Sequence, residues 1–287
     1  MIPGSFDYHR PDSIETAVAL LDSLGDEARV VAGGHSLIPM MKLRMAVPEH
    51  LVDLQDINAL KGISIDGTSV SIGAMTTQAD LITSDQLAAV CPIIRETAEQ
   101  VADPQVRNVG TIGGNVANGD PGNDFPALMQ ALDATYILQG PDGVREVAAR
   151  DFYEAAYFTA LDDGEILTAV RFDASVSGHG YAYLKQKRKI GDYATAAAAV
   201  VLTVQNGTCI SASIALTNVS DTPLFAEAAS QALVGTTLDS DAVAAAVDAA
   251  KAITDPAADG RGPADFRTHV AGVMVGRAIE KAAERAS

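Results

Sequence analysis

The sequence contains only two cysteines, Cys91 and Cys209, which are far apart and belong to no Cys-x-x-Cys pair. Two thiols cannot supply the four thiolates of an iron–sulfur cluster or of a zinc ribbon. We therefore expect both to be buried free thiols. Any iron–sulfur centre that works with this protein has to be held by another chain.

Basic residues and long apolar runs are also scarce. Lys and Arg number 20 against 37 Asp and Glu, a formal net charge of −17 that disfavours nucleic acid and anionic membranes as partners. The longest soft run, residues 194–204, is far shorter than the roughly 20 apolar residues that span a bilayer. No basic stretch followed by an apolar one opens the chain. We expect no direct membrane insertion and a cytoplasmic location.

Several common catalytic and nucleotide motifs are missing. The five histidines are scattered, and neither His-Glu-x-x-His nor Gly-x-Ser-x-Gly occurs, so hydrolytic chemistry has little support. Gly-x-Gly-x-x-Gly and the Gly-x-x-x-x-Gly-Lys-Ser/Thr phosphate loop are absent as well, which disfavours the familiar NAD and ATP folds. We assign no catalytic residue and no metal ligand to this chain.

Two glycine pairs are present instead. Residues 32–36 read Ala-Gly-Gly-His-Ser and residues 111–115 read Thr-Ile-Gly-Gly-Asn. Each pair alone is compatible with an ordinary tight turn. Because glycine lacks Cβ, its backbone can take positive φ and bring N–H groups close to an anion, and Ser36, Thr111 and Asn115 add side-chain donors. Together the loops predict one phosphate-rich ligand that is held from two sides.

The surroundings of both loops resemble the FAD-binding medium subunits of the molybdenum hydroxylases. Residues 32–44 and 102–115 carry this resemblance, which extends along nearly the whole chain. Within that family, Gly-Asp-Pro-Gly-Asn-Asp at 119–124, Lys-Arg-Lys at 187–189 and Gly-Asp-Tyr-Ala-Thr-Ala at 191–196 are most similar to medium subunits of aerobic carbon monoxide dehydrogenases.

The resemblance implies an α+β fold. We expect a two-lobed FAD-binding domain of the vanillyl-alcohol-oxidase type, followed by a C-terminal domain of antiparallel sheet and helices. The stretch 175–180 has small, flexible residues between two strand-like runs and is the best candidate linker. We therefore expect the FAD-binding domain at 1–177, with lobes of about 1–54 and 55–177, and the C-terminal domain at 178–287.

The resemblance also implies a set of FAD contacts. Beside the glycine loops, an aspartate at a helix start caps that helix, contacts ribityl or ribose hydroxyls, or does both through different hydrogen bonds. A lysine is either an exposed strand residue or an FAD contact, and a tyrosine either packs between domains or lies at the isoalloxazine ring. The expected residues are Ala32, Gly33, Gly34, His35, Ser36, Leu37, Val101, Thr111, Gly113, Gly114, Asn115, Leu161 and Asp192, together with Asp124, Lys185 and Tyr193 in the three roles just described. We expect His35 to contribute mainly its backbone N–H. The basic run 187–189 is expected to be a solvated face, to steer an acidic partner or to tune the electrostatic field at the cofactor.

The implied function is electron transfer within a complex. FAD in this chain would accept electrons from [2Fe–2S] clusters on a small subunit and pass them to an external acceptor such as a quinone. A large subunit would carry molybdenum-pterin, with copper if the enzyme is a carbon monoxide dehydrogenase, in a dimer of heterotrimers that contacts the inner membrane face only through partners. The alternatives are the medium subunit of another molybdenum hydroxylase, acting on an N-heterocycle or an aldehyde, a self-sufficient FAD reductase or oxidase, and a scaffold protein whose glycine loops are only turns.

Periodicity and turn signals predict the elements. Asp12 or Ser13 can cap a helix that Gly25 ends, Pro48 is expected to end another, and Asn206-Gly207 is a hairpin turn. We expect helices at 14–24, 38–45, 77–84, 91–101, from 124, and at 225–233, 242–253 and within 264–286, and strands at 29–32, 50–54, 70–73, 135–139, 144–147, 165–172, 200–205 and 208–216.

Overall fold

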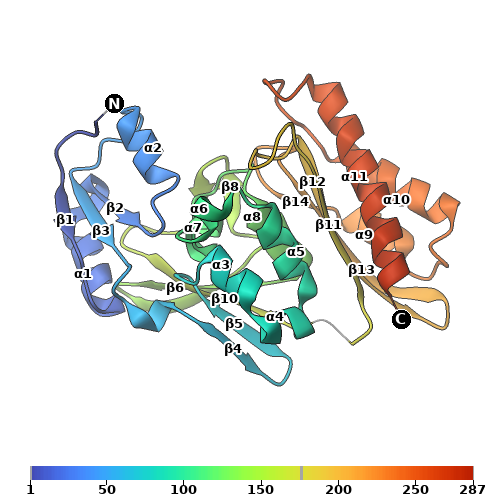
Figure 1. Ribbon diagram of the computed structural model, residues 1–287, viewed down its shortest axis with the longest axis horizontal. Helices are drawn as coiled ribbons and strands as arrows, with labels where there is room; N and C mark the ends of the chain where they lie inside the picture. The colour runs from blue at the N-terminus through green and yellow to red at the C-terminus, as the bar shows by residue number, and fades with distance from the viewer. Residues whose placement is uncertain (1, 175–176, 287) are drawn as a thin grey trace.

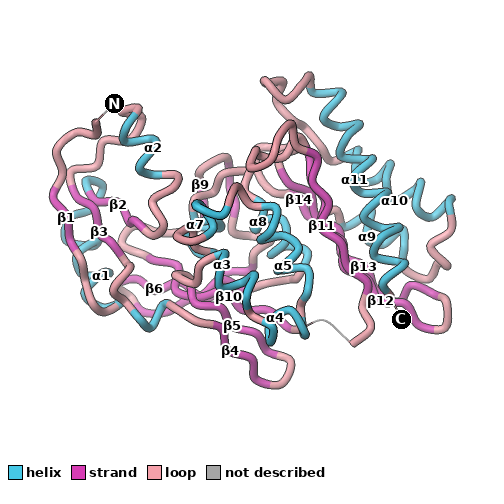
Figure 2. Tube along the Cα trace, viewed as in Figure 1, coloured by secondary structure: helices cyan, strands magenta, loops and turns pink. Residues whose placement is uncertain are grey.

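A computed structural model describes residues 2–174 and 177–286 and contains three larger sheets of three, five and four strands, besides one sheet of two strands. Figure 1 shows the three larger sheets in a row, with the N-terminal sheet at one end and the long C-terminal helix at the other. Figure 2 shows how helices cover the second and third sheets. The predicted α+β class is confirmed. Residues 175 and 176 of the expected linker lie outside the described residues.

The first lobe is a small parallel sheet with one covering helix. Its strands lie in the order β1 (Asp7–His9), β3 (His50–Asp53), β2 (Ala28–Val31). Helix α1 (Ile14–Leu24) starts at the N-cap Ser13, whose hydroxyl accepts from the N–H of Thr16, and ends at Gly25. Its buried face packs with Val52 and with Ile57 and Leu60 beyond the sheet.

The first glycine loop leads from β2 into α2 (Leu37–Lys42). The prediction of a helix at 38–45 that Pro48 ends is wrong at its C-terminal end. The chain turns at Leu43 instead, because Arg44 takes a left-handed φ of 58°, and the N–H groups of Met45 and Ala46 close back onto the carbonyl of Met40.

The second lobe is an antiparallel sheet whose inner face is covered by helices. Its strand order is β4 (Ile63–Asp66), β5 (Ser69–Gly73), β10 (Ile166–Asp173), β6 (Thr135–Gly140), β7 (Gly143–Ala148). Alternate residues such as Val70, Ile72 and Val170 face one core with the helices. Those helices are α3 (Gln78–Thr83), α4 (Asp85–Val90), α5 (Pro92–Gln100), α6 (Pro104–Arg107), α7 (Ile112–Ala117) and α8 (Asp124–Ala131), and a short hairpin joins β8 (Tyr153–Ala155) to β9 (Phe158–Thr159).

The third sheet lies between two helix layers. Its order is β11 (Gly180–Gln186), β12 (Ala196–Gln205), β13 (Thr208–Thr217), β14 (Leu224–Phe225). In the alanine-rich β12, Ala197 and Ala199 face the second lobe, while Ala198 and Val200 face the C-terminal helices. Small side chains on both faces let the layers approach closely. The outer layer consists of α9 (Glu227–Leu233), α10 (Ser240–Ala252) and α11 (Ala264–Arg285).

Most of the predicted elements are present within a few residues of their expected ends. The hairpin at Asn206-Gly207 is confirmed, and both turn residues have positive φ, 52° and 77°. The strand-like run expected after the linker is β11. The expected elements do not include β1, α4, α6, α7, β8, β9 and β14. Helix α7 was missed because two glycines lie inside it. Both cysteines are buried, as expected, and they form no disulfide with each other. Of the helices in the described part of the chain, none is both long enough and apolar enough to span a bilayer.

Candidate functional site

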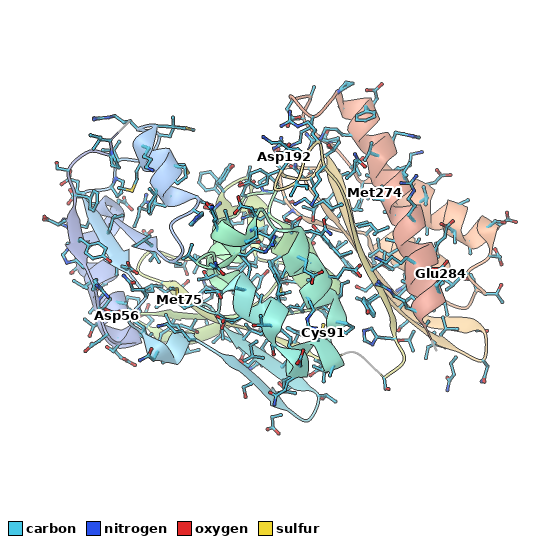
Figure 3. The ribbon with its side chains drawn as sticks, in the orientation of Figure 1. Asp56, Met75, Cys91, Asp192, Met274 and Glu284 are labelled. Carbon is cyan, nitrogen blue, oxygen red and sulfur yellow. The ribbon has the colours of Figure 1, made fainter. Side chains whose placement is uncertain are left out.

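A cavity of about 760 Å³ lies where the two lobes and the β11–β12 region meet. Its volume falls in the range of about 300–1,000 Å³ that is usual for small-molecule and cofactor sites. Met75 of the second lobe and Asp192 of the C-terminal region line it from opposite sides, and Figure 3 labels both. Both glycine loops contribute to its wall.

The first glycine loop presents backbone donors that the protein does not use. In the stretch described around it, the N–H groups of residues 33–36 make no hydrogen bond to backbone or side chain. The ring Nδ1 of exposed His35 lies 2.8 Å from the carbonyl of Gly33. The ring therefore contacts the loop itself, and the backbone N–H of His35 is one of the four that have no acceptor. Four successive free N–H groups at a cavity wall are suited to an anionic group such as phosphate.

The second glycine loop differs from the first. The N–H groups of Ile112, Gly113, Gly114 and Asn115 donate to the Thr76 carbonyl, the Ala74 carbonyl, the Thr111 hydroxyl oxygen and the Thr111 carbonyl. The expectation that both loops offer backbone donors is therefore wrong for this one. The Thr111 hydroxyl accepts through Oγ1 but can still donate its own proton, so the second glycine loop offers a side-chain hydroxyl donor to a ligand.

The glycines of the two loops also have different structural roles. A Cβ on Gly33 would lie 2.3 Å from the carbonyl oxygen of Val109, so Gly33 is needed where the loops touch each other. On Gly114 it would meet only Thr111 Oγ1 at 3.0 Å and Ala32 Cβ at 3.5 Å. Gly114 therefore keeps open space at the cavity wall, whereas Gly33 joins the lobes.

Gln78 adds a polar group that the sequence patterns did not indicate. Its side chain is buried and lines the cavity, and its Nε2 lies 3.3 Å from the Thr111 carbonyl. Its Oε1 is buried without a hydrogen-bond partner among the described residues. Buried polar atoms normally have partners, so this orphan atom fits a ligand or water in the cavity. Its position at the first turn of a helix was readable from the sequence, but its contact with the loop was not.

Asp124 forms a buried ion pair at the same wall. Its carboxylate accepts from Lys185 Nζ at 2.8 Å and from Tyr183 Oη at 2.5 Å, and the Asp124 and Lys185 side chains are 5% and 1% exposed. Burial raises the pKa of Asp124, while Lys185 and Tyr183 act in the opposite direction. Asn123 holds the N-cap position of α8, so the alternative that Asp124 caps this helix is wrong. The alternative that Lys185 is an exposed strand residue is also wrong, because its side chain is buried.

Tyr193 lies at the C-terminal side of the cavity. Its ring rests on Gly122, where a Cβ would come within 2.7 Å of Tyr193 Cδ1. The Arg261 guanidinium lies 5.8 Å from the ring centroid. Burial and the nearby Asp120 raise the pKa of Tyr193, so its hydroxyl stays protonated. With 41% of its surface exposed, the ring can contact a ligand.

The basic run 187–189 is partly engaged. Arg188 pairs with Asp192 at 2.9 Å, and Lys187 donates to Gln100 Oε1 at 2.8 Å. Burial and neighbouring Lys185 lower the pKa of Lys187. The run is therefore not simply a solvated face.

The structure brings every residue expected to contact FAD to this one cavity. Whether each touches a flavin stays a prediction. Cavity-lining residues that the sequence patterns missed include Met40, Ala46, Gln78 and Tyr157. The expected residues, all found in the lining, are Ala32, Gly33, Gly34, His35, Ser36, Leu37, Val101, Thr111, Gly113, Gly114, Asn115, Asp124, Leu161, Lys185, Asp192 and Tyr193.

Comparison with known proteins defines the class. Residues 4–173 match the FAD binding domain in molybdopterin dehydrogenase, and residues 181–282 match the CO dehydrogenase flavoprotein C-terminal domain. The chain belongs to this flavoprotein family, and the resemblance drawn from its motifs is confirmed.

Individual relatives are similar along their whole length. The chain is 66% identical to the carbon monoxide dehydrogenase medium chain of Afipia carboxidovorans, covering 100% of this chain and 99% of the relative. It is 50% identical to the corresponding chain of Hydrogenophaga pseudoflava, covering 98% of each. A crystal structure of the cyanide-inactivated Cu,Mo-CO dehydrogenase superposes with a TM-score of 0.99 at 66% identity over 100% of both chains.

Proposed function

We propose that this chain is the FAD-carrying electron-transfer subunit of an aerobic carbon monoxide dehydrogenase. The observation that carries the proposal is the full-length identity of 66% with a medium chain of that enzyme. The uncommitted donors and the orphan Gln78 oxygen at one cavity support it, because they fit a polar, phosphate-bearing cofactor.

In this proposal the pyrophosphate of FAD lies between the glycine loops. The free N–H groups of residues 33–36 bind it on one side, and the hydroxyl of Thr111 binds it on the other. Asp124 contacts ribityl or ribose hydroxyls, Lys185 makes a polar contact with FAD, and Tyr193 lies at the isoalloxazine. FAD supplies the redox chemistry when bound, and the protein groups position it and set its electrostatic surroundings.

The remaining centres belong to partner chains. Two cysteines cannot hold iron–sulfur clusters, so [2Fe–2S] clusters are placed on a small subunit and molybdenum-pterin with copper on a large one. We propose a dimer of such heterotrimers in the cytoplasm, since most soluble oligomers are closed and symmetric. The electron acceptor is external, such as a quinone, and is reached at the inner membrane face through partners.

We also propose two domains, at 1–177 and 178–287, with lobes of about 1–54 and 55–177 in the first. The separate family matches at 4–173 and 181–282 support this division. Limited proteolysis that releases two stable fragments cut near residue 178 would agree with it.

The test of function follows flavin reduction under carbon monoxide. The chain is purified alone and with its co-expressed partners, and bleaching of the flavin absorbance is recorded anaerobically. We expect reduction only in the complex. Reduction in the lone subunit would contradict the division of labour. No reduction by carbon monoxide but reduction by an N-heterocycle would instead favour another molybdenum hydroxylase.

A further inference from the structure

Helix α5 is aligned with the edge strand β11 through two pairs of contacts. Glu96 Oε1 accepts from the N–H of Tyr183 at 2.8 Å, and the Gln100 carbonyl accepts from Lys185 Nζ at 3.2 Å. Four residues of helix advance about 6 Å and two residues of strand about 6.8 Å. Because these spacings match, one helical turn of α5 sets the position of two successive inward-facing residues of β11.

Glu96 also connects α5 to the C-terminal helix α11. Its carboxylate lies 2.8 Å from Arg285 and 3.3 Å from Lys281. Arg285 donates to the Tyr181 carbonyl at 2.7 Å, and its guanidinium lies 4.3 Å from the Tyr181 ring centroid. Burial raises the pKa of Glu96, but Arg285, the Tyr183 N–H and Lys281 together hold it below its ordinary value. Glu96 is therefore a charged link between the second lobe, the strand and the C-terminal helix.

The strand held in this way carries part of the cavity wall. β11 is the edge of its sheet, so the N–H of Tyr183 has no neighbouring strand to receive it. The Tyr183 hydroxyl and the Lys185 ammonium are the two groups that bind Asp124. Glu96 itself is outside the cavity lining. A shift of β11 along α5 would separate both groups from Asp124.

We propose that Glu96 is a positioning residue of the cofactor site. It sets the register of β11 against the second lobe, and through Tyr183 and Lys185 it sets the geometry of Asp124 at the cavity. The affinity for FAD and the surroundings of the flavin ring then depend on a carboxylate that does not touch the cofactor. The inference rests on the proposed function only in taking FAD as the ligand.

The test uses the assembled complex with Glu96→Gln. The amide keeps an oxygen for the Tyr183 N–H but loses the charge that Arg285 and Lys281 bind. We expect the dissociation constant of FAD to rise at least about fivefold, the lower end of typical coupling between sites. The visible circular dichroism of the bound flavin should change as well, which a purely structural loss of stability would not cause.

Glu146→Gln is the matched control. Glu146 pairs with Arg171 at 2.6 Å in the second lobe, and neither residue lines the cavity. Equal FAD dissociation constants and equal flavin spectra in Glu96→Gln and Glu146→Gln would overturn the proposal.

Arg285→Met keeps the test decisive if the Glu96 variant does not assemble. It removes the α11 side of the same link, so it should weaken FAD binding in the same direction, and wild-type binding would overturn the proposal. The double variant should lose less affinity than the product of the two single effects, because both act through one contact. A wild-type complex that binds FAD but does not reduce it with carbon monoxide would contradict the proposed function alone. A wild-type complex without FAD would contradict both.

Discussion

Replacing Lys185 with methionine should destabilise the subunit strongly, even without cofactor. Lys185 and Asp124 form an ion pair of 2.8 Å with side chains 1% and 5% exposed. Removing one member of a buried pair leaves the other charge uncompensated and typically costs about 3–5 kcal/mol. In domains of about 150–250 residues, each kcal/mol of destabilisation lowers the melting temperature by about 2–4 °C. The melting temperature of this subunit should therefore fall by on the order of 10 °C.

The double variant Lys185→Met with Asp124→Asn distinguishes the loss of the ion pair from a packing defect caused by methionine. Its asparagine can still accept from Tyr183, and no buried charge remains, so most of the lost stability should return. Thermal unfolding of the flavin-free subunit is followed by circular dichroism at pH 7 and at about pH 5. The deficit of the single variant should shrink at the lower pH, because burial already raises the pKa of Asp124 and a proton can replace the missing ammonium.

Two results would refute this reasoning. A single variant that melts within about 2 °C of wild type would mean that the pair contributes little. A double variant no more stable than the single one would mean that methionine packs badly at this position. In either case the geometry of the pair would not explain the stability of the cavity wall.

Three further predictions concern the glycine loops, acid stability and the flavin ring. Gly33→Ala should lower the melting temperature, because the added Cβ would lie 2.3 Å from the Val109 oxygen. Gly114→Ala should keep the melting temperature within about 2 °C of wild type and reduce the FAD content of the complex. Similar melting temperatures in both variants would contradict their different roles. The folded-state pKa of Glu96 lies below its ordinary value of 4.5, so its stabilising contribution should be fully present above about pH 5 and be lost as the pH falls through that lower value. A melting-temperature gap between wild type and Glu96→Gln that does not close in acid would disprove this. Tyr193→Ala should shift the reduction potential of the flavin or its reactivity with acceptors more than it shifts the melting temperature, and an unchanged potential would return Tyr193 to a packing role.

Much of the cofactor cavity could be predicted because its residues belong to short, locally readable motifs. Both glycine loops line the cavity, and so do Asp192 and Tyr193 of the Gly-Asp-Tyr-Ala-Thr-Ala motif at 191–196. The cavity also contains Met40, Gln78 and Tyr157, which no motif indicated. Their side chains reach the site only because distant segments pack together.

The hydrogen bonds of the loops could not be predicted from composition. Two Gly-Gly steps look equivalent in sequence, but among the described residues the N–H groups of the first have no acceptor, whereas those of the second are used within the protein. The difference arises because the carbonyls of Ala74 and Thr76 lie beside the second loop and accept from Gly113 and Ile112, while Thr111 accepts from Gly114 and Asn115. Spacing along one segment carries no information about such neighbours.

The sequence by itself determined the local features of this protein: the helix that Ser13 caps, the turn at Asn206-Gly207 and the absence of thiol ligands for a cluster. These depend on backbone conformation and residue chemistry within a few positions. Only the tertiary structure decided that Asp124 pairs with Lys185, 61 residues away, and that Glu96 meets Arg285. Such pairs form because folding buries them together, and the burial that acts to raise the pKa values of Asp124 and Glu96 does not exist until the layers have packed.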